Sequence, residues 1–124
     1  MTTSPCESDA LSVEFEEEPG DVLVAHIHGA LDLSTAPALD RALSRYLEEV
    51  RARRVLLDLR DMEFLGCQGV TVLVRVARWA KVHTGCEPPC LVGLSSCGRR
   101  LLALVEVIDM FSVQDSVEGA LTGE

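Results

Sequence analysis

The feature that most constrains the fold of this chain is a regular alternation between two kinds of apolar pattern. Residues 11–16 alternate apolar and polar side chains, the period of a half-buried strand, and 55–59 form the short aliphatic run of a buried strand. Between such segments, apolar residues recur at spacings of three, four and seven, which is typical of amphipathic helices. We expect strands at 11–16, 22–27, 55–59, 90–94 and 110–113, and helices at 36–50, 69–83, 95–107 and 116–121.

Strands that alternate with helices in this order predict an α/β fold. We expect a small mixed β-sheet of about five strands with about four helices packed against it. The chain has 124 residues, the length of one domain. We place that domain at 11–121 and expect 1–10, which are small and polar, to form a flexible N-terminal tail.

The charge balance bears on the partners of the protein. Eleven Lys and Arg against 20 Asp and Glu leave a net charge of −9, which argues against nucleic acid and anionic membranes, because both are bound mainly by cationic side chains.

No apolar run has the roughly 20 residues of a spanning helix, so we expect no membrane insertion. The first ten residues lack the basic and apolar regions of a signal peptide. These features predict a cytoplasmic protein with reduced thiols.

Few residues suggest catalysis or a cofactor. The chain has no glycine-rich phosphate loop and no nucleophile elbow. Four residues that could ligate zinc have the spacing H-x2-C-x3-C-x6-C instead of paired knuckles, so we expect no metal and no cofactor. They are His83, Cys86, Cys90 and Cys97.

The segment at 64–70, F-L-G-C-Q-G-V, runs from a strand into the start of a helix. Gly66 and Gly69 allow a tight turn, and a helix N-terminus favours the thiolate form of a cysteine. Cys67 is therefore the thiol that we expect to be most reactive. It could fill the turn, act as a redox sensor or serve as a nucleophile, but the arginine that a cysteine phosphatase needs six residues later is Leu73.

The helix that follows is apolar on two faces. Val72, Val76 and Trp79 lie at i, i+4 and i+7, away from the face that carries Val74 and Ala77. Such a helix is either packed on both sides or presents an apolar surface to a partner. Tryptophan is enriched at the energetic centres of interfaces, which favours a role for Trp79 in binding.

Three segments resemble the STAS domain and, within it, the anti-sigma factor antagonists of bacteria. They are G-A-L-D-L-S-T-A at 29–36, V-L-L-D-L-R-D-M-E-F-L at 55–65 and D-S-V-E-G-A-L at 115–121. The resemblance spans residues 11–121. It implies a binding module and no enzyme: such antagonists bind an anti-sigma factor, usually one with a kinase fold, and release a sigma factor. The alternative is a STAS scaffold or accessory subunit of a stress-signalling or transport complex.

The chain departs from the family at its phosphorylation motif. Family members have D-S-S-G or a similar sequence after the Phe-Leu pair, and the anti-sigma kinase phosphorylates the hydroxyl and thereby breaks the complex. Here the motif is G-C-Q-G, so Cys67 occupies the phosphoacceptor position and is not expected to be phosphorylated. The partner could be bound constitutively, oxidation of Cys67 could switch binding, or Thr71 could serve as another acceptor.

The resemblance and the two-faced helix together give a predicted partner-binding surface, while the oligomeric state stays open. Its residues are Asp32, Ser34, Thr35, Gly66, Cys67, Gln68, Gly69, Thr71, Val72, Val76 and Trp79.

Overall fold

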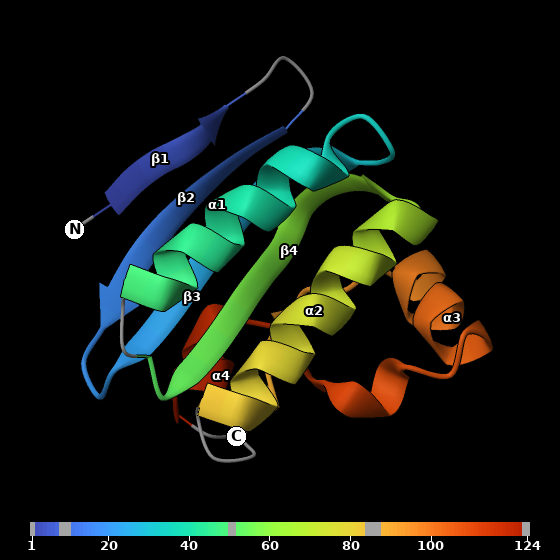
Figure 1. Ribbon diagram of the computed structural model, residues 1–124. Helices are drawn as coiled ribbons and strands as arrows, with labels where there is room; N and C mark the ends of the chain where they lie inside the picture. The colour runs from blue at the N-terminus through green and yellow to red at the C-terminus, as the bar shows by residue number, and fades with distance from the viewer. Residues whose placement is uncertain (1, 8–10, 50–51, 84–87, 123–124) are drawn as a thin grey trace.

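A six-stranded mixed sheet forms the centre of the computed structural model, which describes residues 2–7, 11–49, 52–83 and 88–122 (Figure 1). The strands lie side by side in chain order, with β1–β2 and β2–β3 antiparallel and the remaining pairs parallel. The α/β class predicted from the alternating patterns is confirmed. The strands are β1 (Thr2–Glu7), β2 (Leu11–Glu18), β3 (Val22–Leu31), β4 (Arg54–Leu65), β5 (Cys90–Val92) and β6 (Ser112–Gln114).

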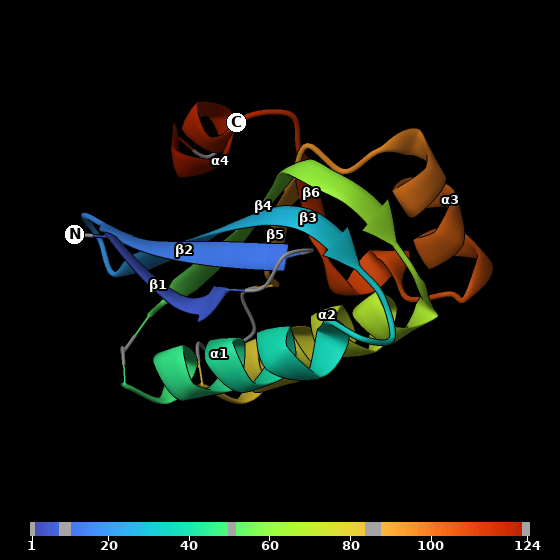
Figure 2. The ribbon, with the colours of Figure 1, turned by 90° about the horizontal axis from the view of Figure 1, so that it is seen from above.

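The helices cover the two faces of the sheet unequally. Figure 2 shows α1 and α2 side by side on one face, α4 on the opposite face and α3 beside the end of β4. Ser95 caps α3 by accepting a hydrogen bond from the Gly98 N–H (3.0 Å), and Ser116 caps α4 in the same way (3.0 Å). The helices are α1 (Ala36–Glu49), α2 (Cys67–His83), α3 (Ser96–Leu104) and α4 (Val117–Thr122), with a 3-10 turn η1 (Ile108–Met110).

Alternation along β3 produces the two cores. Leu23, Ala25 and Ile27 point into the large core that includes α1 and α2, whereas Val22 and Val24 point to the small core under α4. Successive side chains of a strand face opposite sides, so the strand needs apolar residues on both sides wherever helices cover both. Beyond Val24 the strand carries His26 and His28, which contact carboxylates of β2 and β4.

The structure differs from the sequence prediction at the N-terminus. We expected a tail at 1–10, but Thr2–Glu7 forms strand β1 along the outer edge of β2. An edge strand presents unpaired N–H and C=O groups that an extended segment can satisfy. The prediction missed β1 because this strand is placed by hydrogen bonds to its neighbour. Its sequence shows no apolar alternation that could indicate a strand.

Strand β4 is longer than predicted. We expected a strand at 55–59 and a helix at 69–83, but β4 continues to Leu65 and α2 begins directly after, at Cys67. Pairing with the far half of β3 extends β4, with two register irregularities between the strands. This extension brings the ends of β3 and β4 to the same edge of the sheet.

Candidate functional site

The two motifs predicted to bind a partner meet at the carboxyl ends of β3 and β4. Because these strands are parallel, Leu31 lies opposite Leu65, and the Gly66 N–H donates to the Leu31 carbonyl (2.9 Å). The loop 32–35 that enters α1 and the turn 66–69 that enters α2 are therefore neighbours (Figure 1). The structure thus brings together two segments that lie more than 30 positions apart in the sequence.

A hydrogen-bonded turn holds Asp32 in the first of these segments. Its carboxylate accepts from the Ser34 N–H (2.9 Å), the Ser34 hydroxyl (2.8 Å) and the Thr35 N–H (3.2 Å). The bond from the Ser34 hydroxyl lowers the pKa of Asp32, and the backbone N–H groups add to this shift. Asp32 is therefore a fixed negative charge at the edge of the sheet.

Thr35 shapes the loop from inside. Its side chain is buried, its hydroxyl donates to the Ala30 carbonyl (2.9 Å), and it accepts from the Asp32 N–H (2.9 Å). Of the three loop residues predicted to contact a partner, Asp32 and Ser34 have accessible surface, whereas Thr35 acts through the conformation of the loop.

Leu33 is a residue that the sequence prediction missed. It lies between Asp32 and Ser34 and is 72% exposed. An apolar side chain in a loop between two polar residues, with no strand or helix period to bury it, is the signal that could have identified it. It adds an exposed apolar side chain beside the polar groups of Asp32 and Ser34.

The second segment presents its thiol to solvent. Cys67 and Gln68 are exposed at the start of α2, and the exposed Thr71 donates its hydroxyl to the Cys67 carbonyl (3.4 Å). Gly69 is buried, and a Cβ atom there would lie 2.7 Å from side-chain atoms of both Leu31 and Leu65. Gly69 therefore allows α2 to begin in contact with both strands and takes no direct part in the surface.

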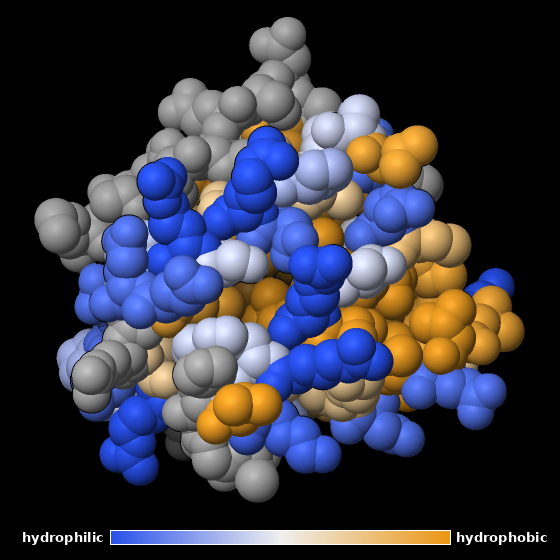
Figure 3. Space-filling view, viewed as in Figure 1, coloured by the Kyte–Doolittle hydropathy of each residue, from blue (hydrophilic) through white to orange (hydrophobic). Residues whose placement is uncertain are grey.

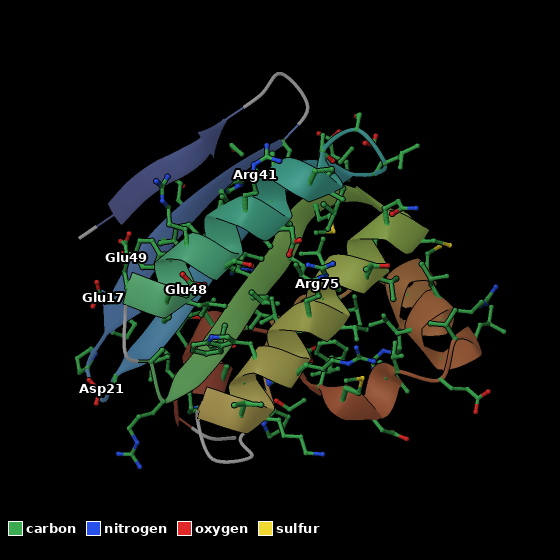
Figure 4. The ribbon with its side chains drawn as sticks, viewed as in Figure 1. Glu17, Asp21, Arg41, Glu48, Glu49 and Arg75 are labelled. Atoms are coloured by element: carbon green, nitrogen blue, oxygen red, sulfur yellow. The ribbon has the colours of Figure 1, made fainter. Side chains whose placement is uncertain are left out.

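The structure corrects the prediction for the apolar face of α2. Val72 (3% exposed) and Val76 (4% exposed) belong to the large core and cannot contact a partner, and Trp79 is only partly exposed and packs against that core. The helix is apolar on two faces because it is packed on two sides, and the exposed side chain of Arg75 on α2 binds Asp40 of α1 (3.1 Å) across its outer surface (Figure 4). Of the two alternatives for this helix, packing on both sides is therefore correct, and the apolar surface for a partner is not.

Two of the four residues considered as zinc ligands, Cys90 and Cys97, lie in different elements of the structure. Cys90 is buried in β5, as its apolar surroundings in the sequence suggested, and Cys97 is exposed on α3. Cys86 lies outside the described residues. Among the described side chains, no three histidine, cysteine or carboxylate groups converge as metal ligands.

Two further surface features, one acidic and one apolar, lie outside this candidate surface. The exposed residues Glu17, Asp21, Glu48 and Glu49 gather where α1 ends, at the end of the sheet opposite Cys67 (Figure 4). Apolar side chains instead gather on the side of α3, where Leu104 is 73% exposed (Figure 3).

None of the helices in the described ranges combines the length and apolarity that crossing a membrane requires.

A charged cluster that the sequence analysis did not predict lies on the face of the sheet opposite α1 and α2, which we call the open face. Asp58 of β4, 4% exposed, receives the Nε and an Nη of Arg60 (both 2.9 Å) and lies 2.7 Å from Nδ1 of His26, whose Nε2 contacts Glu16 (3.0 Å). Burial raises the pKa of Asp58, but Arg60 and His26 outweigh it and lower that pKa to about 2. An aspartate within the aliphatic run V-L-L-D-L is the signal that could have revealed the cluster.

Comparison with known proteins identifies the family of this chain. Residues 13–120 match the STAS domain. The anti-sigma-F factor antagonist RsfB of Mycobacterium tuberculosis is 29% identical over 117 residues, which cover 93% of this chain and 90% of RsfB.

Two solved structures share the fold. The structure of an anti-sigma factor antagonist from Mycobacterium paratuberculosis is similar, with a TM-score of 0.79, 25% identity and coverage of 95% and 97% of the two chains. The phosphorylated form of the Bacillus cell fate determinant SpoIIAA superposes with a TM-score of 0.70, at 14% identity and coverage of 90% and 97%. With the match spanning nearly the whole described chain, the protein belongs to the STAS domain family.

Proposed function

We propose that this protein is an anti-sigma factor antagonist that binds a kinase-fold anti-sigma factor in the cytoplasm and thereby releases a sigma factor. Its surface consists of Asp32, Leu33 and Ser34 from one segment and Gly66, Cys67, Gln68 and Thr71 from the other. The observation that carries the proposal is that both family motifs meet at one edge of the sheet, with exposed side chains at their centre. The antagonists named among its relatives support this function.

We also propose that this antagonist works without the phosphorylation switch at position 67. A thiol replaces the hydroxyl there, and an exposed thiol can be oxidised to a sulfenic acid, with peroxide reduced to water. Cys67 lies in the middle of the proposed surface, so oxidation would change both charge and bulk where the partner docks. Constitutive binding and phosphorylation at Thr71 are the competing modes of regulation. A role as a binding regulator instead of an enzyme is part of the same proposal.

Affinity capture from a lysate of the source organism, followed by mass spectrometry, tests the partner. We expect an anti-sigma factor to be retained by the reduced protein. A triple variant Asp32→Ala, Leu33→Ser, Gln68→Ala should lose it, while Glu48→Ala, on the far end of α1, should retain it. Capture of stress-signalling or transport proteins in place of an anti-sigma factor would overturn the proposed partner and favour the scaffold alternative.

Titration calorimetry with the captured anti-sigma factor tests the thiol. We expect Cys67→Asp to weaken binding by about tenfold or more, because a buried interfacial charge without a partner costs several kcal/mol. Cys67→Ser, of similar size and uncharged, should bind like the wild type. Peroxide should weaken the wild-type complex and leave the Cys67→Ser complex unchanged; equal affinity before and after oxidation of Cys67 would establish constitutive binding.

A further inference from the structure

A cavity of about 410 Å³ lies beside the candidate surface and contains none of the residues predicted to bind a partner. It opens between the carboxyl-terminal half of β4, the end of the loop that follows β5, and the first turn of α3. Its lining includes Leu59, Met62, Glu63, Leu65, Leu94 and Cys97. A volume of this size lies within the range of small-molecule sites, roughly 300–1,000 Å³.

The lining determines what the cavity can hold. Four aliphatic or thioether side chains form most of the wall, which favours an apolar molecule. Glu63 is the charged residue of the lining, and its negative charge disfavours an anion. At the start of α3, where an anion could otherwise bind, the Ser95 hydroxyl already accepts from the Gly98 N–H (3.0 Å).

The cavity also has a chemical marker at its wall. Cys97 lines it and is exposed, so a reagent can reach its thiol from solvent. The exposed thiol of Cys67 lies outside the lining. The chain therefore carries a reporter cysteine within the cavity and a matched reference cysteine on a neighbouring surface.

We propose that this cavity is a binding site for a compact apolar molecule that carries no negative charge. The aliphatic wall would remove the apolar surface of the ligand from water, and Glu63 would accept a hydrogen bond from a neutral or cationic amine. The site is separate from the surface proposed for the anti-sigma factor, although Leu65 borders both. The proposal does not rest on the identity of the protein partner.

The neutral fluorophore N-phenyl-1-naphthylamine tests the site with the full chain. We expect saturable binding of one molecule per chain, seen as a rise in fluorescence. In the wild type, bound fluorophore should slow alkylation of Cys97 by iodoacetamide about fivefold or more and leave the rate at Cys67 unchanged, as the occupancy of a single site would produce. Peptide mass spectrometry separates the two cysteines.

Two variants complete the test. Cys97→Trp should fill the cavity and weaken fluorophore binding about tenfold or more. Leu104→Ser, on the exposed apolar side of the same helix, should bind like the wild type. No saturable binding, equal protection of both cysteines, or loss of binding in Leu104→Ser would overturn the proposal. The protection experiment uses the wild type, so it tests the proposed site even if Cys97→Trp fails to fold.

Discussion

At the scale of single residues, the start of α2 depends on the absence of a side chain at position 69. Gly69 lies against Leu31 and Leu65, and a Cβ atom would come within 2.7 Å of both. Leu31 is completely buried, so it has little room to move. The position of Cys67, two residues earlier in the same turn, follows from this close approach of helix and strands.

We predict that Gly69→Ala lowers the free energy of unfolding by about 2 kcal/mol, because contacts of 2.7 Å with two leucines put the strain near the upper end, about 3 kcal/mol, of the usual cost of overpacking a core. The gain of roughly 1 kcal/mol that alanine brings to a helix is too small to reverse the sign. Urea denaturation measures the change. Gln68→Ala is the matched control: its side chain is exposed in the same turn, and its effect should stay within about 0.5 kcal/mol. Equal stability of the two variants would contradict this account.

At the scale of elements, α2 is packed on two sides and exposed at its first turn. Its first residues, Cys67 and Gln68, are exposed, whereas Val72 and Val76 are buried. The helix contacts α1 on one side and β4 on another, so both of its apolar faces have structural partners. Only the first turn and the outer stripe remain available for binding another protein.

We predict that Val76→Ala lowers the free energy of unfolding by about 2 kcal/mol, because it removes two buried methyl groups and leaves a cavity. The affinity for the anti-sigma factor should not change, since the side chain does not reach the surface. Urea denaturation and calorimetry measure the two quantities. Arg78→Ala, exposed on the same helix, should change stability by less than about 0.5 kcal/mol. If Val76→Ala has normal stability but binds the anti-sigma factor more weakly, the prediction is wrong and Val76 lies in the interface.

At the scale of the whole molecule, the open face of the sheet carries charges that connect three strands. Glu16 of β2, His26 of β3 and Asp58 of β4 form a row of contacts of 3.0 and 2.7 Å, and Arg60 completes it. Burial lowers the pKa of His26, but the hydrogen bonds to Glu16 and Asp58 outweigh it, so the pKa is raised above 6.5. When it is protonated, the imidazole connects the hairpin to the parallel part of the sheet through both contacts.

We predict a pH dependence of stability that His26 carries. Its folded pKa is raised, so its contribution is fully present below the unfolded pKa of 6.5 and is lost as the pH rises through the folded pKa. The difference in unfolding free energy between the wild type and His26→Gln should thus be larger at about pH 6 than at about pH 8.5. Urea denaturation at both pH values measures this difference, and an NMR titration of the imidazole locates its pKa directly. A difference independent of pH would contradict the prediction.

The sequence could predict the features that depend on neighbouring residues along the chain. The apolar periods identified five strands and four helices, because burial on one face imposes a period of two or of 3.6 within each element. The caps Ser95 and Ser116 are a local feature of the same kind, because each accepts a hydrogen bond from an N–H only three residues ahead. That the loop at Asp32 and the turn at Cys67 belong to one surface was predicted from the family resemblance. The apolar period of either segment gave no indication of it.

Only the tertiary structure decided which apolar side chains reach the surface and which polar ones do not. Val72 and Val76 look like an exposed stripe in sequence but are buried, while Leu33 is exposed and Asp58 is almost inaccessible. Strand β1 and the second half of β4 exist because distant strands offer them backbone hydrogen bonds. Burial and strand pairing are set by neighbours that come from elsewhere in the chain, whereas periodicity is a local property. For this reason the sequence by itself determined the α/β class and the element order, and the packed fold determined the shape of the surface that a partner meets.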